Sequence, residues 1–293
     1  MAEQKAAGYD LLKIHPGLSR ASFDTLVATA RRAGIPFAGH VPEQVGIARA
    51  IEARYASIEH LDGYVEGMLR DGATLTPEQS AFFGLNLGDQ LDETKMPALV
   101  QATKRADVWN VPTQVLLENL VVAGTSHQLA QRPEMRFVPA ATRSQWAEVK
   151  DGMLEETGST LESARRTVQV RRRLIKALHQ AGAGILLGSD APQIYNVPGF
   201  STHRELESLV GAGLTPYQAL ETGTRNIARY FGTEKETGTI EKGKRADLVL
   251  LDADPLADIR NTTRRSGVMV RGRWLPQAEI ERRLDQVAKA VGN

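Results

Sequence analysis

Short apolar runs alternate with amphipathic segments along most of the chain. We expect strands near residues 9–14, 35–40, 56–60 and 108–116, and a further one at 183–190, where the apolar run ends in Gly-Ser-Asp. Runs of this length between helical patterns are typical of a parallel sheet covered by helices. The pattern therefore predicts an α/β fold.

The segments between these runs have helical spacing and helix start and stop signals. Ser19 is a candidate N-cap for a helix that ends at Gly34, and Thr215 begins a capping box with proline at its first position. We expect further helices at 45–53 and 161–182, and one beginning at Thr76. The longer segments 61–107 and 118–158 are predicted to be mostly helical insertions, which often form substrate walls.

After Gly232 the pattern changes to short strands separated by glycine turns. We expect strands within 238–252 and 267–274, a hairpin tip at Arg271-Gly272, and a terminal helix from about residue 276. The predicted divisions are a main α/β domain over 1–232, a small β portion over 233–275 and the helix over 276–293.

Composition narrows the choice of partners. The 293 residues include 36 Lys and Arg and 35 Asp and Glu, so the net charge is +1 and no strong field favours nucleic acid or an anionic membrane. The chain has no cysteine, which excludes disulfides and thiolate metal sites. No apolar run is long enough for a membrane-spanning helix. None of these features indicates a cellular compartment.

Candidate chemistry lies at the ends of the predicted strands. Lys13, His40, His60 and Asp190 each stand at or near the end of an apolar run, and the carboxyl ends of parallel strands are where catalytic groups collect. A single histidine there is more often structural, and a lysine can be a surface residue. The ordered set favours a divalent metal site, because imidazole and carboxylate are common metal ligands.

The order of these residues resembles the metal-dependent amidohydrolase superfamily, and within it the imidazolonepropionase-like and dipeptidase-like branch. The resemblance is carried by the following segments: Gly39-His40-Val41-Pro42, Ser57-Ile58-Glu59-His60-Leu61, Gly188-Ser189-Asp190, His203 to Glu207, Thr224 to Arg229 and Gly238 to Val249. It covers nearly the whole chain.

The resemblance implies a distorted (β/α)8 barrel with a small β-sandwich built from both ends of the chain. Lys13 would be the carboxylated lysine of the fourth strand, bridging two divalent ions, with Zn²⁺ the first candidate. His40 and His60 would be ligands from the fifth and sixth strands, and Asp190 would end the eighth. The implied reaction is hydrolysis of an amide-like C–N bond, in a small cyclic amide or a dipeptide. Metal-activated water would attack, and Asp190 would bind metal and carry the proton.

One departure from the family pattern changes the expectation. The family's first strand carries a His-x-His pair, and no two of the six histidines here are separated by one residue. We therefore expect a partial barrel, strands four to eight, with part of the sandwich at the C-terminal end. Its exposed sheet edges would favour self-association. Two other functions stay open: a catalytically silent partial barrel that binds or assembles, and hydrolysis of esters, lactones or organophosphates on the same site.

Three further residues are candidates with plain structural alternatives. His15 follows Lys13 by two and is either a group supporting the site or a loop residue. His203 is either a substrate contact or part of a polar network at a helix start. Tyr64 either polarises a substrate carbonyl or packs in the core.

Overall fold

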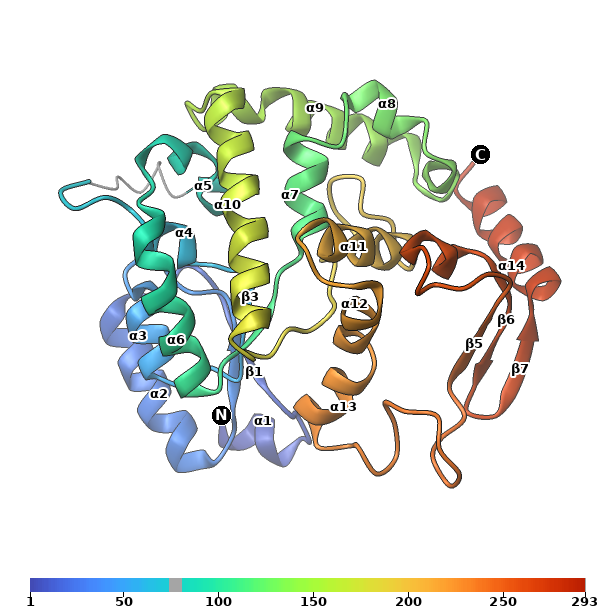
Figure 1. The fold of residues 1–293 in the computed structure, drawn as a ribbon, viewed down its shortest axis with the longest axis horizontal. Coiled ribbons are helices and arrows are strands. Elements are labelled where there is room, and N and C mark those ends of the chain that lie inside the picture. Colours follow the sequence, from blue (N-terminus) through green and yellow to red (C-terminus); the bar gives the residue numbers. More distant parts are fainter. Residues whose placement is uncertain (74–80, 293) are drawn as a thin grey trace. The chain divides into compact units, whose positions relative to one another are not determined.

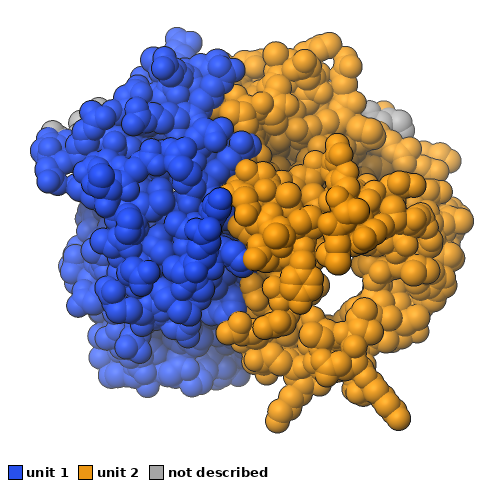
Figure 2. All heavy atoms as spheres, in the orientation of Figure 1, with its two compact units in different colours: residues 1–113, 154–186 blue, residues 114–153, 187–293 orange. Residues whose placement is uncertain are grey.

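The computed structural model describes residues 1–73 and 81–292, and it divides the chain into two compact units. Unit 1 comprises Met1–Thr113 and Leu154–Leu186, and unit 2 comprises Gln114–Met153 and Leu187–Asn293 (Figure 2). The helix start expected at Thr76 lies outside the described residues. The boundaries predicted at 232 and 275 stay predictions.

Unit 1 is built on a parallel sheet with its strands in chain order, and Figure 1 labels β1 and β3 of this sheet. Neighbouring strands pair in register, with Ile14 opposite Gly39 and Ile58 opposite Asn110. This confirms the predicted α/β class with a parallel sheet. The four strands are β1 (Leu12–Ile14), β2 (Phe37–Gly39), β3 (Ser57–Glu59) and β4 (Trp109–Val111).

Helices join these strands in βαβ order. Ser19 caps the first connecting helix as predicted, its hydroxyl accepting from the Ser22 N–H at 3.2 Å, and Gly34 ends it in a left-handed conformation. The helices and 3-10 turns of unit 1 are α1 (Ala2–Ala6), α2 (Arg20–Ala33), α3 (Gly46–Glu52), α4 (Tyr64–Gly67), α5 (Ala81–Gly84), η2 (Leu85–Gln90), η3 (Glu93–Lys95), α6 (Met96–Ala106) and α10 (Leu161–Gln180).

Every strand predicted for unit 1 is longer than the one observed, and two predictions differ most. The predicted strand 108–116 ends at Val111, because Thr113 takes a φ of 46° and a helix begins at Gln114. The run at 183–190 lies parallel to β4 at a single bridge, Asn110 to Ile185, and forms no longer strand. Backbone bonds from Asn110 to Gly184 and from Leu186 to Asn110 hold that bridge.

Unit 2 combines helices with a separate sheet. The capping box at Thr215 is confirmed, since Thr215 and Gln218 exchange side-chain hydrogen bonds with each other's backbone. Its helices and 3-10 turns are α7 (Gln114–Val121), α8 (Ser126–Ala130), η4 (Pro133–Phe137), α9 (Ala140–Glu156, the end of which lies in unit 1), α11 (Phe200–Gly211), α12 (Pro216–Thr222), α13 (Arg225–Phe231), η5 (Ile259–Thr263) and α14 (Gln277–Ala290).

The sheet of unit 2 is antiparallel, with strand order β5 (Leu248–Leu251), β6 (Arg265–Val270) and β7 (Arg273–Pro276). Arg271 and Gly272 form the predicted hairpin tip, both with positive φ. The Asp247 carboxylate accepts from the Arg271 N–H at 2.7 Å and secures this turn. Helix α14 packs on the sheet and begins where the sequence predicts.

Within the described part of the chain, no helix combines the length and the apolar character needed to cross a membrane.

Gly88 provides a test of the packing in unit 1. Turn η2 lies so close to α10 that a Cβ on Gly88 would stand 2.1 Å from the backbone oxygen of Ser163. We expect Gly88→Ala to lower the free energy of unfolding by about 1–3 kcal/mol, because neither backbone can yield without losing contacts. Urea unfolding measures the change. Gly17→Ala is the control, since a Cβ there meets nothing; equal effects of the two substitutions would contradict the packing.

Candidate metal centre

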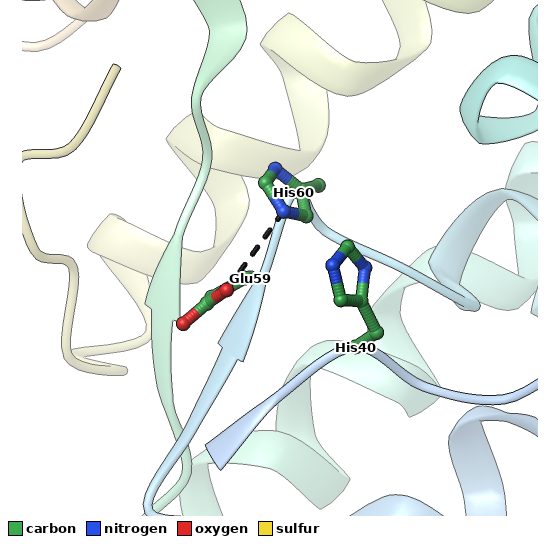
Figure 3. Close-up of side chains that lie close together, drawn as sticks. All are labelled: His40, Glu59 and His60. Atoms are coloured by element: carbon green, nitrogen blue, oxygen red, sulfur yellow. Dashed lines mark ion pairs between the residues drawn. The ribbon is translucent and has the colours of Figure 1, made fainter. Parts of the chain in front are cut away.

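Three side chains converge where β2 and β3 end. His40 follows β2 directly, Glu59 is the last residue of β3, and His60 comes next (Figure 3). One ligand atom from each lies within 4.8 Å of the others. The two imidazoles are stacked, with ring centroids 4.7 Å apart. The structure therefore brings together two of the predicted ligands and adds a carboxylate that was not predicted.

The backbone of His60 explains why Glu59 joins the group. Side chains next to each other along a regular strand point to opposite faces, so a regular strand would keep Glu59 and His60 apart. His60 has a φ of 59°, so the alternation stops at this residue. Its Nε2 consequently lies 3.8 Å from the Glu59 Oε2. The available sequence signal was an acidic residue inside an otherwise apolar run.

His40 is oriented by a carboxylate. Its Nδ1 is 2.8 Å from the Oδ2 of Asp62, which lies two residues beyond His60 and is largely buried. Burial raises the pKa of Asp62, while the hydrogen bond from His40 opposes that rise. A carboxylate on one ring nitrogen leaves the other free to bind a cation. Sequence reasoning missed Asp62.

His60 is held by groups at the end of β4 and on α10. The residue is 2 % exposed, and its Nδ1 lies 2.9 Å from the Thr113 hydroxyl. Its carbonyl accepts from the Arg171 guanidinium at 2.6 Å. Burial lowers the pKa of His60 to about 3, and the charges of His40, Arg171 and Lys13 act in the same direction. The imidazole is therefore neutral at neutral pH, which is its metal-binding form.

Lys13 reaches the group from β1. Its ammonium lies 2.7 Å from the Glu59 Oε2, and its side chain is 58 % exposed. The side chain of Lys13 passes close to Gly39. A Cβ at position 39 would lie 3.1 Å from the Lys13 Cγ and 2.6 Å from the Ile14 oxygen. Glycine at this position, with a φ of 118°, thus allows the lysine to pass over β2. His15 is exposed and meets the His40 ring edge-on at 5.8 Å.

The donor set fits a divalent ion. Each imidazole has its Nδ1 engaged by a side-chain oxygen, so each can offer Nε2, and Glu59 supplies a carboxylate oxygen between them and Lys13. Two nitrogens and one oxygen suit zinc and other borderline metals. An unmodified Lys13 is a cation on the same carboxylate and can be a ligand only after it is neutralised or carboxylated.

Asp190 belongs to unit 2, in a loop with unusual backbone. Asp190 has a φ of 55°, and Ile194 and Tyr195 also have positive φ. The side chain of Gln193 donates to the Asp190 Oδ2. The Asn196 amide donates to the carbonyl of Ser189 at 2.6 Å. These bonds hold the carboxylate in a defined local position.

The two candidate substrate residues have well-defined surroundings. Tyr64 is fully buried in unit 1, where its hydroxyl lies 2.8 Å from that of Thr103; this favours the packing alternative. His203 lies within α11 of unit 2, with its Nδ1 2.9 Å from the Thr262 hydroxyl. That bond places it in a polar network. A substrate contact for either residue stays a prediction.

The model of a protein family matches most of the chain, and curated relatives match about a third of it. The model of the amidohydrolase family matches residues 12–275. A 5-methylthioadenosine/S-adenosylhomocysteine deaminase of Moorella thermoacetica is 34% identical over 113 residues, 36% of this chain and 25% of that protein. An imidazolonepropionase of Agrobacterium fabrum is 34% identical over 90 residues, 29% of this chain and 20% of that protein.

Among solved structures, a bottromycin amidohydrolase superposes with a TM-score of 0.69 at 24% identity. The match covers 99% of this chain and 61% of the other, so the chain spans about three fifths of that protein. At this identity the likeness concerns the fold, which is that of a TIM-like barrel. The family predicted from the strand-end residues is confirmed.

The buried His60 makes stability depend on pH. Its pKa is about 3 in the folded chain and near its ordinary 6.5 when unfolded. Below pH 6.5 the unfolded chain therefore binds a proton that the folded chain does not. We expect His60 to cost about 1.4 kcal/mol of stability for each pH unit of acidification from 6.5 toward 3.

Urea unfolding of the metal-free chain and of His60→Gln, from about pH 7.5 to about pH 5, measures this slope. Glu66, whose pKa is raised to about 7 by burial, changes the stability with pH in the opposite direction. Its contribution is present in both chains and cancels when the slope of His60→Gln is subtracted from the native slope. His127→Gln, at an exposed site, should keep the native slope. Equal slopes for the native chain and His60→Gln would contradict the burial of a neutral imidazole.

Proposed function

The chain belongs to the amidohydrolase family, and from this we propose that it hydrolyses amide-like C–N bonds with a divalent metal ion held at the ends of β2 and β3. The observation that carries the proposal is the convergence of His40, Glu59 and His60 within 4.8 Å. In addition, both imidazoles have Nδ1 bonded to a side-chain oxygen, so Nε2 is the nitrogen that each ring would offer to the ion.

His40, His60 and Glu59 would hold the ion, and Lys13 would join them once carboxylated. Zn²⁺ is the first candidate, because it accepts mixed nitrogen and oxygen ligands. A bound metal of this kind supplies a Lewis acid for the substrate carbonyl and lowers the pKa of water. Asp62 and Thr113 keep the two rings in orientation, and the buried His60 stays neutral without the ion.

Asp190 is the proposed ligand and proton carrier from unit 2. A carboxylate can accept the proton of the attacking water and deliver it to the leaving nitrogen. Gln193 steadies one oxygen of this carboxylate. The residues His203 and Tyr64 remain proposed substrate contacts.

The substrate would be a small molecule with an amide-like bond, such as a cyclic amide or a dipeptide. The names of the relatives, a deaminase and an imidazolonepropionase, support C–N bonds as the class. Hydrolysis of esters, lactones or organophosphates is the alternative on the same site, since a fold does not determine the bond cleaved. A silent partial barrel that acts by binding is the other alternative.

The finer architecture is also a proposal. We assign β1, β2 and β3 to the fourth, fifth and sixth strands of the family barrel, and the run at Ile185 to a later one. The antiparallel sheet of unit 2 would be part of the family's β-sandwich. β1 lies at an edge of its sheet, which supports the predicted self-association through exposed strand edges.

Metal binding tests the site directly. We expect titration of the metal-free chain with ZnCl₂ in a calorimeter to show saturable binding that weakens at least about 10-fold in His40→Ala and Glu59→Gln. His40→Ala removes a nitrogen donor, and Glu59→Gln removes the negative charge of the carboxylate. His127→Ala is the control, because that histidine is exposed and remote in sequence from the strand ends. Binding that is equally strong in all three variants would reject the site.

Catalysis tests the role of Asp190. In the Zn²⁺-loaded chain we expect Asp190→Asn to reduce hydrolysis by about 10²–10⁴-fold, because an amide cannot take up the proton of the attacking water. A panel of dipeptides, cyclic amides, lactones and esters, followed by product release, identifies the bond class. The matched control is Asp285→Asn, an exposed carboxylate on α14.

Retention of full activity in Asp190→Asn would reject the assigned role. A chain that binds Zn²⁺ and cleaves nothing in the panel would favour the silent barrel.

A further inference from the structure

We propose that Arg171 is a positioning residue whose buried guanidinium fixes the ends of β3 and β4 and thereby holds the His60 ring with Nε2 facing Glu59. The inference deepens the proposed metal site and rests on it. Arg171 lies on α10, is 0 % exposed, and is not one of the three residues of the proposed metal group.

The guanidinium binds two carbonyls from neighbouring strand ends. One Nη donates to the oxygen of His60 at 2.6 Å and the other to the oxygen of Pro112 at 3.0 Å. These residues stand just beyond the last paired residues of the two strands, Glu59 and Val111. The last backbone hydrogen bond between the two strands runs from the His60 N–H to the Val111 oxygen at 2.8 Å. Arg171 thus extends the link between β3 and β4 by one residue.

The backbone needs this link because the ladder cannot continue regularly. His60, Leu61 and Thr113 all have positive φ, so both strands turn away directly after their last pair. Proline at 112 has no N–H to contribute to a ladder. Buried carbonyls left without a donor are costly, and a planar guanidinium can serve two of them at a fixed spacing.

The two carbonyls that Arg171 binds belong to residues that determine the position of the His60 ring. The partner of its Nδ1 is the hydroxyl of Thr113, the residue that follows Pro112. Arg171 therefore holds both the residue that carries the ring and the neighbour of the residue that orients it. If Nδ1 donates to Thr113, then Nε2 is unprotonated and points to Glu59, 3.8 Å away. Without the guanidinium, the His60 ring and the Thr113 hydroxyl could move independently of each other.

The charge of the Arg171 guanidinium acts on three ionisable groups of unit 1. The charge of Arg171 acts to lower the pKa values of Asp62 and Glu66, two acidic groups whose pKa values burial raises. Its charge also disfavours a protonated His60. The positive charge of Arg171 thus favours the ionised form of both carboxyl groups and adds to the effect of burial, which is the main reason that the pKa of His60 is low.

The test uses the metal-free full chain labelled with ¹⁵N-histidine, at about pH 8, where the imidazole nitrogen shifts report which nitrogen carries the proton. The His60 signal is assigned with His60→Gln. In the native chain we expect a single tautomer, because the ring is held in one orientation by its neighbours. In Arg171→Lys, whose compact ammonium cannot replace the fork, and in Arg171→Met, we expect a mixture of both forms. Thr113→Val should give a similar mixture, and Arg165→Lys, on the exposed face of α10, should match the native chain.

Calorimetric titration with ZnCl₂ gives the second readout. We expect affinity to fall about 10-fold or more in Arg171→Lys, as when a group that orients a metal ligand is lost. Urea unfolding verifies that each variant is folded. If Arg171→Met fails to fold, Arg171→Lys carries the test. A folded Arg171→Lys with the native ring signal and native Zn²⁺ affinity would overturn the inference.

The two readouts separate this inference from the proposed function. A native chain that binds no Zn²⁺, combined with a changed ring signal in Arg171→Lys, would reject the metal site and uphold the role of Arg171. A native chain that binds Zn²⁺, combined with an Arg171→Lys variant whose ring signal and Zn²⁺ affinity are unchanged, would uphold the metal site and reject the role of Arg171.

Discussion

The proposed metal-ligand group depends on the left-handed turn of the backbone at His60. A regular strand would send Glu59 and His60 to opposite faces. With a φ of 59° at His60, both side chains meet His40 at the carboxyl edge of the sheet. The turn also ends the β3–β4 ladder, which creates the need for Arg171 and Thr113 at the same place. Ligand geometry and its supporting bonds therefore follow from one local conformation.

Charge around this turn is balanced within unit 1. Lys13 neutralises Glu59, and Asp62 bonds to His40. His60 avoids the cost of a buried charge by remaining neutral, as its lowered pKa indicates. The arrangement offers two imidazole nitrogens and a carboxylate to an ion. A divalent cation would compete with the Lys13 ammonium for Glu59, which gives carboxylation of Lys13 a clear electrostatic benefit.

Much of the fold could be predicted from the sequence. Strands β1 to β3, the helix between Ser19 and Gly34, the capping box at Thr215 and the hairpin tip at Arg271 all lie where local pattern places them. Periodicity and capping are local, so these elements needed no tertiary information. The strands predicted at 108–116 and 183–190 were too long. Their lengths are decided by Thr113, which leaves the ladder, and by pairing limited to the bridge at Ile185.

The sequence by itself determined the family, the parallel α/β class and the positions of His40 and His60 at strand ends, because short-range pattern and residue order carry that information; Lys13 lies inside β1 and not at its end. Only the tertiary structure brought in Glu59, Asp62, Thr113 and Arg171. Glu59 depends on a single φ angle, and the other three depend on hydrogen bonds to residues on different elements. Sequence spacing cannot encode such contacts, since they arise only when separate strands and a helix pack together.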